Sequence, residues 1–187
     1  MVMSTESTAN ESRDLKVEVS PRDHVQGSPS APVVLVEYGD YECPDCLNAW
    51  PIVQELQRTF GPKLAFVFRH YPQSSIHPHA SAAAQAAEAA GAQGKFWEMH
   101  DLLFSHQHDL DSLDLTHLGL QLGLEVYRFQ SALEDEKLAR KVRDDFTGGQ
   151  LSGVPGTPTF FLNGQRYRGR RDAESMGSEI RSMLTKA

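Results

Sequence analysis

The chain has 187 residues and a formal net charge of −7. That length predicts one domain with room for an insertion. The acidic balance argues against nucleic acid as a partner, because phosphate binding needs a basic surface. No apolar stretch approaches the roughly 20 residues that span a bilayer, so we expect no membrane insertion.

The N-terminal segment is polar. Residues 1–22 are rich in Ser, Thr, Glu and Asp, which predicts a disordered tail ahead of a domain over residues 23–187. The segment lacks the basic start and the apolar core of a secretory signal, so we expect a cytoplasmic protein. Its thiols would then face a reducing pool. Residues 25–32 carry Gly, Pro and Ser and predict a connector.

The next segment predicts a strand-helix-strand unit. Residues 33–36 form a β-branched apolar run, typical of a buried strand that continues through Glu37. A helix is expected over 43–60, before a Gly-Pro stop. Residues 64–68 predict a second buried strand. The short link between helix and strand favours a crossover with parallel strands.

Residues 78–147 carry helical signals and no strand signal, so they predict a helical insertion. The flanking parts, 23–77 and 148–187, would form the rest of the domain. Within the insertion we expect helices over 79–91, 95–106, 116–122, 125–132 and 135–146.

Strand signal returns at residues 159–162. Asn163-Gly164 favours a two-residue hairpin turn, because both residue types tolerate positive φ. Residues 165–168 would form the returning strand, and 172–184 a closing helix. The order of elements predicts an α/β fold.

The only two cysteines lie in Cys43-Pro44-Asp45-Cys46. A Cys-x-x-Cys pair that follows a strand and opens a helix is typical of a redox motif. The positive end of the helix dipole lowers the pKa of a thiol placed there. We therefore expect Cys43 to be the exposed nucleophile and Cys46 to resolve the mixed disulfide.

Glu37 lies six residues before Cys43, at the end of the first buried strand. Burial would raise the pKa of its carboxyl group. We expect Glu37 to accept the proton of Cys46 through water. The alternative is a carboxylate at the strand edge that pairs with a lysine.

Eight histidines invite a metal interpretation, but none of their spacings completes a known site. We therefore expect no metal and no organic cofactor, while zinc shared between the cysteine pairs of a dimer remains an alternative. The basic run Arg166, Arg168, Arg170 and Arg171 is interpreted as a solvated edge that discourages aggregation.

In combination, these motifs resemble the thioredoxin superfamily, and the helical insertion is similar to its DsbA-like branch. The resemblance covers residues 23–187. It implies an α/β thioredoxin-like fold with a helical insertion between the βαβ unit and a C-terminal ββα unit. The residues and stretches that carry it are Glu37, the Cys-x-x-Cys pair, Pro51, the segment Gly156-Thr157-Pro158-Thr159, and the stretches 36–44, 93–97 and 154–164.

The resemblance implies roles for individual residues. Pro158 would be a cis-proline that lies against the cysteine pair. Thr157 would offer backbone groups to a substrate strand, and Pro44 and Asp45 would also face the substrate. The partners would be protein thiols or disulfides and an unidentified redox partner. The alternative is a peptide-binding module that uses Thr157 and Pro158 and has incidental redox activity.

Asp45 departs from the family pattern, because oxidising DsbA proteins usually carry a histidine at this position. A carboxylate there is expected to raise the pKa of Cys43 and to destabilise the thiolate. We therefore expect a reducing or isomerising bias. If the carboxylate points into water, screening removes most of this effect.

Overall fold

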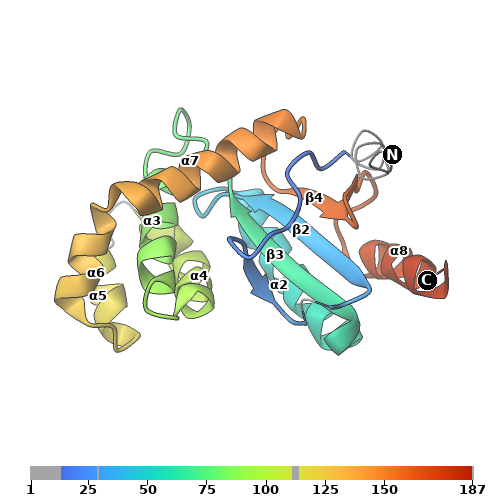
Figure 1. Cartoon of the computed structure of the whole chain (residues 1–187), viewed down its shortest axis with the longest axis horizontal. Coiled ribbons are helices and arrows are strands. Elements are labelled where there is room, and N and C mark those ends of the chain that lie inside the picture. Colours follow the sequence, from blue (N-terminus) through green and yellow to red (C-terminus); the bar gives the residue numbers. More distant parts are fainter. Residues whose placement is uncertain (1–13, 29, 111–113, 187) are drawn as a thin grey trace, which may run out of the picture.

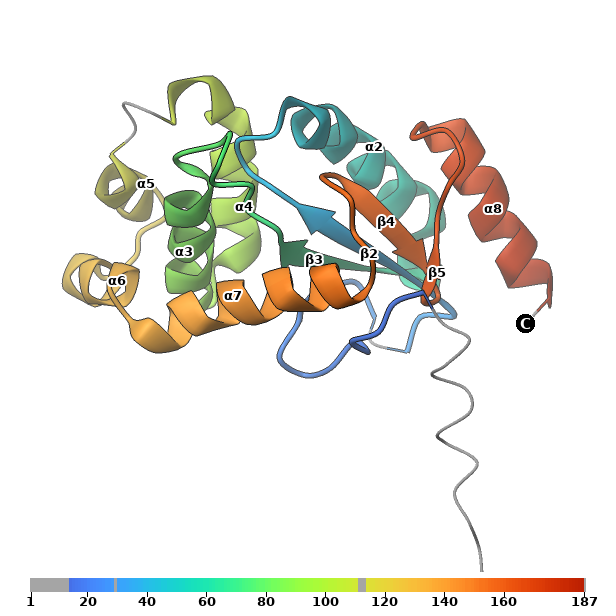
Figure 2. The ribbon, with the colours of Figure 1, turned by 90° about the horizontal axis from the view of Figure 1, so that it is seen from above.

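The computed structural model describes residues 14–28, 30–110 and 114–186. Figures 1 and 2 show a central sheet with helices on both faces and a cluster of helices beyond one end. Helices α2 and α8 cover one face, and α7 crosses the other. Outside the helical insertion, the helices are α2 (Pro44–Phe60) and α8 (Ala173–Lys186).

The sheet has the order β1-β3-β2-β4-β5. Its two central strands, β2 and β3, run parallel, and the other neighbours pair antiparallel. This confirms the predicted crossover and the C-terminal hairpin. The strands are β1 (His24–Gln26), β2 (Val33–Gly39), β3 (Leu64–His70), β4 (Thr159–Leu162) and β5 (Gln165–Arg166).

Strand β1 was not predicted, because its sequence was interpreted as part of a connector. The strand has only three residues, too few for a clear alternating pattern, and Gly27 follows them at a φ of 99°. The strand forms because its backbone pairs with the free edge of β3, with Val25 opposite Val67. Such a pairing depends on a distant segment and leaves no local pattern.

The predicted helical insertion is present between β3 and β4. Its last helix reaches Leu151, whereas the sequence predicted an end at Phe146. The extension includes Gly149, where a Cβ atom would lie 2.6 Å from the ring of Tyr71. The glycine therefore lets the helix lie close to the sheet. The helices of the insertion are α3 (Ala80–Gly91), α4 (Phe96–Ser105), α5 (Leu115–Gln121), α6 (Val126–Leu133) and α7 (Glu136–Leu151). The insertion also holds a short 3₁₀ turn at Gln107–Asp109, and another, Gly61–Lys63, follows α2.

Side chains that alternate along β3 enter two separate cores. Phe66 and Phe68 pack with residues of α2, α3 and α4. Val67 packs on the opposite face with Val36 and Tyr38. The first core contains both cysteines, so the active-site region is continuous with the larger core.

Residues 14–22, which were expected to belong to the polar tail, lie against the sheet. Leu15 is buried, and its N–H donates to Gly164 O at 2.9 Å. The guanidinium group of Arg69 is also buried and donates to the carbonyl oxygens of Val17 and Glu18. A buried charge needs such acceptors, which explains the order of this segment. Residues 1–13 of the predicted tail lie outside the described residues.

In the parts of the chain that the structure describes, every helix is too short or too polar to cross a bilayer.

Candidate active site

The cysteine pair lies where β2 leads into α2. Cys43 is the N-cap residue of α2, and Pro44 occupies the first turn, where no helical hydrogen bond is lost. Cys43 Sγ lies 3.3 Å from Thr157 O, to which it donates when it is protonated, and Asp40 N donates to Cys46 Sγ at 3.4 Å. Both thiols are free.

Cys43 is less exposed than the sequence predicted. Its exposed fraction is 6%, and that of Cys46 is 0%. The difference arises because the loop at Thr157 and Pro158 packs over Cys43. The neighbouring Pro44 and Asp45 are exposed.

The two thiols have opposite pKa shifts. The Cys46 side chain, as a hydrogen-bond partner, lowers the pKa of Cys43 to about 6, against the effect of burial. The Thr157 side chain and the N–H groups of Cys46 and Asp45 contribute further. Burial raises the pKa of Cys46 well above its usual value, and the charges of Glu37 and Cys43 add to this. At neutral pH the pair therefore holds one thiolate and one thiol.

Asp45 does not have its expected effect. Its carboxylate is 62% exposed and lies 3.6 Å from Arg171 Nη2, and its backbone N–H lowers the pKa of Cys43. The prediction that Asp45 raises the pKa of Cys43 is therefore wrong, since the charge faces water and a cation. Arg171 also donates to Pro158 O at 3.2 Å, a contact that the interpretation of a solvated basic edge missed.

Glu37 is buried at the end of β2, as expected. Its Oε1 atom has no hydrogen-bond partner among the described residues, so the alternative of a lysine pair finds no support. Burial and, to a smaller extent, the charge of Cys43 raise the pKa of Glu37 to about 8, whereas Arg171 opposes the shift. The carboxyl group is therefore mostly protonated at neutral pH while Cys43 is a thiolate.

The peptide bond between Thr157 and Pro158 is cis, as the resemblance implied. Thr157 Oγ1 accepts a hydrogen bond from Gln73 Nε2 at 2.8 Å, while its carbonyl oxygen faces Cys43. The structure thus brings Cys43, Cys46, Thr157 and Pro158 together, with Glu37 behind the thiols.

Several residues that hold the active-site turn were not predicted. Asp40 Oδ2 accepts hydrogen bonds from Gln73 N and interacts with His77 Nδ1 at 2.7 Å. Gln107 Nε2 donates to Tyr41 O at 2.8 Å and Cys43 O at 3.0 Å. From the sequence, His77 was interpreted only as a possible metal ligand. Nothing in its local pattern indicates that it contacts Asp40, 37 residues earlier in the chain.

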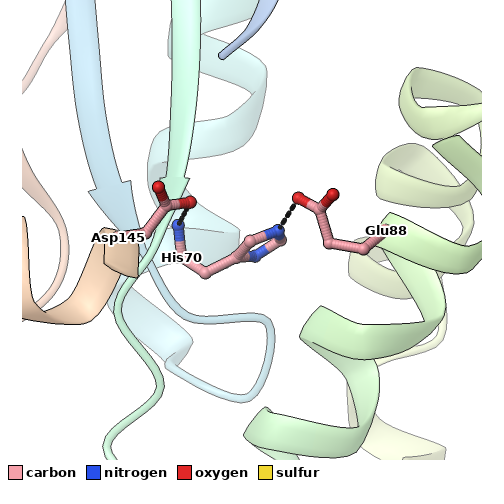
Figure 3. Close-up of side chains that lie close together, drawn as sticks. All are labelled: His70, Glu88 and Asp145. Atoms are coloured by element: carbon pink, nitrogen blue, oxygen red, sulfur yellow. Dashed lines mark hydrogen bonds and ion pairs between the residues drawn. The ribbon is translucent and has the colours of Figure 1, made fainter. Parts of the chain in front are cut away.

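One group of described residues has the composition of a metal site. His70, Glu88 and Asp145 each place a ligand atom within 4.8 Å of the others. Figure 3 shows Glu88 pointing at the His70 ring and Asp145 at the His70 backbone. However, Lys141 Nζ donates to both oxygens of Asp145 at 2.7 and 2.6 Å. Because an ammonium group already neutralises this carboxylate, we interpret the cluster as an ion-paired contact between the insertion and the sheet.

Comparison with known proteins is consistent with this geometry. A family model described as Thioredoxin matches residues 19–182. Among solved structures, a thioredoxin-like oxidoreductase from Silicibacter pomeroyi is 25% identical, with a TM-score of 0.74, and covers 90% of this chain and 95% of its own. BdbD from Bacillus subtilis is 25% identical, with a TM-score of 0.77, over 88% of this chain and 94% of its own. The fold also matches α-DsbA1 from Wolbachia pipientis, with a TM-score of 0.78 at 19% identity, over 94% of this chain and 97% of its own.

A curated relative with higher identity is a longer protein. A protein named Na(+)/H(+) antiporter NhaA 1, from Salinispora arenicola, is 48% identical over 90% of this chain. The match covers 26% of that relative, so this chain spans about a quarter of its length. Taken together with the site geometry, the matches show that the chain belongs to the thioredoxin family, and its Cys-x-x-Cys pair is Cys43 and Cys46.

Proposed function

We propose that the protein exchanges disulfides with other proteins, with Cys43 as the attacking thiolate and Cys46 as the resolving thiol. The observation that carries this assignment is the placement of the two thiols: Cys43 caps the N-terminus of α2 beside Thr157 O, whereas Cys46 lies one turn deeper and is fully buried. The opposite pKa shifts of the two thiols agree with it. The pKa of Cys43 is lowered to about 6, and burial holds that of Cys46 well above its usual value. Only the thiolate is nucleophilic, so the first attack belongs to Cys43.

The exchange proceeds in two steps. The Cys43 thiolate attacks one sulfur of a substrate disulfide, which forms a mixed disulfide and releases the other substrate sulfur as a thiolate. Cys46 then loses its proton to Glu37 and attacks the Cys43 sulfur. The bond between Cys43 and the substrate breaks, the Cys43–Cys46 disulfide forms, and the second substrate thiolate leaves. The substrate is reduced by two electrons and the cysteine pair is oxidised by two. Pro44, Asp45, Thr157 and Pro158 would contact the substrate.

We further propose that the pair favours reduction or isomerisation over strong oxidation. The support is that the residue between Pro44 and Cys46 is not a cation, since the Asp45 carboxylate pairs with Arg171, and that the pKa of Cys43 is lowered less than that of DsbA. A value of about 6 lies between those of thioredoxin, about 7, and DsbA, about 3.5. A moderately stabilised thiolate makes the reduced form moderately stable. We therefore expect a reduction potential well below that of DsbA, about −120 mV, and a measured value near −120 mV would contradict the proposed bias.

A trapping experiment tests the assignment. In Cys46→Ala protein, the mixed disulfide with Cys43 forms but is not resolved, so bound proteins remain attached through Cys43 and can be identified by mass spectrometry. The matched control is Cys43→Ala, which keeps one thiol but lacks the attacking group. Equal capture by the two variants, or none by Cys46→Ala, would rule out the proposed roles.

The same pair of variants addresses the peptide-binding alternative. Full cellular function in Cys43→Ala protein would favour a binding module with incidental redox activity. The cytoplasmic location stays a prediction, and labelling of Cys43 in intact cells with a membrane-impermeant maleimide would contradict it. Zinc analysis of the purified protein would test the remaining alternative of a shared metal site.

A further inference from the structure

A small cavity connects the buried carboxyl group of Glu37 with the surface between α2 and α4. Its volume is about 40 Å³. Its inner wall is buried and includes Glu37, Val53 and His100, while Asp101 lies at the exposed end. A cavity needs roughly 10–15 Å³ and two to four polar partners to hold a water molecule. This one meets both conditions.

The exposed end of the cavity is framed by two hydrogen bonds. Trp50 Nε1 donates to Asp101 Oδ1 at 2.9 Å, which joins α2 to α4. Gln57 Nε2 donates to Gln26 Oε1 at 2.8 Å, which joins α2 to β1. Both pairs line the cavity. Glu37 and both pairs therefore line one cavity, and Asp101 is the ionisable residue at its exposed end.

Glu37 needs such a connection if it serves Cys46. In the reduced protein, burial holds the pKa of Glu37 at about 8, and the charge of Cys43 contributes. The carboxyl group is then mostly protonated at pH 7 and must lose that proton before it can accept another. Formation of the mixed disulfide removes the charge of Cys43, which makes loss of the Glu37 proton easier.

Apart from Asp101, few of the groups around Glu37 can accept its proton. Burial lowers the pKa of His100 to about 3, so its ring stays neutral at physiological pH. Burial raises the pKa of Tyr41 well above its usual value, so it keeps its proton. Arg171 carries a positive charge and lowers the pKa of Glu37 without accepting a proton. The titratable and charged groups that act on or lie beside Glu37 are Cys43, Cys46, Arg171, His100, Asp101 and Tyr41.

We propose that protons move between Glu37 and solvent through water in this cavity, and that Asp101 is a positioning residue that transfers them at its exposed end. This inference rests on the proposed function, because it concerns the step in which Cys46 resolves the mixed disulfide. For each turnover, one proton leaves Glu37 through the cavity, and the proton of Cys46 then takes its place on Glu37. The net result is one proton delivered to solvent, and no further reactant is required.

A two-phase reaction separates the steps. Reduced protein is mixed with an aromatic disulfide whose thiolate product absorbs visible light. The first thiolate is released by attack of Cys43, and the second by attack of Cys46. Glu37→Gln should slow the second phase by about 100-fold, a typical contribution of general base catalysis. The first phase, which needs no proton acceptor, should keep at least its usual rate.

Two variants test the cavity itself. Val53→Leu adds a methylene group to the cavity wall and should slow the second phase by about tenfold while sparing the first. Asp101→Asn keeps the acceptor for Trp50 but removes the ionisable group. It should slow the second phase by about threefold at low buffer concentration and regain the rate when a small buffer such as imidazole is added. The matched control is Glu55→Gln, which removes one negative charge from the exposed side of α2 outside the cavity.

The outcomes separate the two proposals. Urea unfolding of Val53→Leu shows whether the variant keeps its fold, and Asp101→Asn supplies an independent test at the surface. If Glu37→Gln slows the second phase but neither cavity variant does, the route is wrong and the role of Glu37 stands. If Glu37→Gln leaves the second phase unchanged, both the route and that role fail. Absence of the first phase would instead remove the proposed function.

Discussion

Arg171 and Asp45 form an ion pair across the active site, with 3.6 Å between Nη2 and Oδ2. Asp45 belongs to the Cys-x-x-Cys motif, whereas Arg171 lies beyond the C-terminal hairpin and also donates to Pro158 O. The side chains are 46% and 62% exposed, so water screens their interaction. Asp45 is the residue at which the sequence departs from the family pattern. Its negative charge is thus partly neutralised by Arg171, which lies 126 positions later in the chain.

This pairing predicts a small effect of removing the Asp45 charge. Asp45→Asn should change the pKa of Cys43 by less than about half a unit, because a screened and paired charge has little influence. Asp45→His should make the pair more oxidising, since a cation stabilises the thiolate, and each 1.4 kcal/mol of stabilisation corresponds to about 30 mV. The potentials of both variants can be measured in glutathione buffers. A large shift in Asp45→Asn would show that the carboxylate acts directly on the thiol.

The pKa of Cys43 predicts the pH dependence of the first attack. The rate with a small disulfide should rise through a midpoint near pH 6 and level off above it, as the thiolate fraction does. The ultraviolet absorbance of the thiolate should follow the same curve. In Cys46→Ala protein the midpoint should move upward, because the hydrogen bond from Cys46 is the largest cause of the shift. An ordinary midpoint near 8.5 in the unmodified protein would contradict the assignment.

Glu37→Gln should increase stability. Burial raises the pKa of Glu37 from 4.5 to about 8. Below pH 4.5 the carboxyl group is protonated in both states and the shift has no effect on folding. Above that value the unfolded chain ionises first, so the cost to the folded state grows until about pH 8. At pH 7 the variant should gain about 2 to 4 kcal/mol in free energy of unfolding.

Urea unfolding at two pH values checks the sign of this change in the free energy of unfolding. The difference between Glu37→Gln and the unmodified protein should be present at pH 7 and nearly absent at pH 4.5. The same variant resolves mixed disulfides more slowly in our proposal, so stability and activity should change in opposite directions. Equal stability at both pH values would mean that the carboxyl group is not held protonated.

Glu88 has the opposite effect on stability. Although burial raises its pKa, hydrogen bonds with His24 and His70 hold the pKa of Glu88 well below its usual value of 4.5. A lowered carboxyl pKa contributes stability that is complete above pH 4.5 and is lost as the pH falls below it. Glu88→Gln should therefore reduce the free energy of unfolding at pH 7 by about 3 kcal/mol.

As the pH falls below 4.5, the free energy of unfolding of Glu88→Gln should also decrease less than that of the unmodified protein. Glu98→Gln is a suitable control, because Glu98 is 45% exposed and pairs with Lys95 at the surface. Its effect should stay below about 1 kcal/mol. If the control and Glu88→Gln behave alike, the buried contact in Figure 3 contributes no more than a surface pair.

The sequence predicted the elements whose signals are local. The apolar run before Glu37 and the helix that opens at Pro44 both have clear patterns, and the structure places them as expected. The motif around Pro158 was assigned a cis bond only through its resemblance to the family. On sequence alone, a proline before a strand is compatible with either isomer.

The features that sequence analysis missed all depend on contacts between distant segments. Strand β1 exists because its backbone pairs with β3, and residues 14–22 are held by the buried guanidinium group of Arg69. Arg171 belongs to a run of arginines that looks uniformly solvated, yet its side chain reaches Asp45. Nothing in the order of residues indicates which member of such a run faces the active site.

Gln107 belongs to the helical insertion, and its amide group holds the carbonyl oxygens of Tyr41 and Cys43. Two further contacts, His77 with Asp40 and His79 with Glu42, join the same turn to the loop that leads into the insertion. The insertion and the redox motif are therefore not interchangeable parts. A chimera that exchanges the insertion with that of a relative would retain the geometry of Cys43 only if these pairs were transferred together.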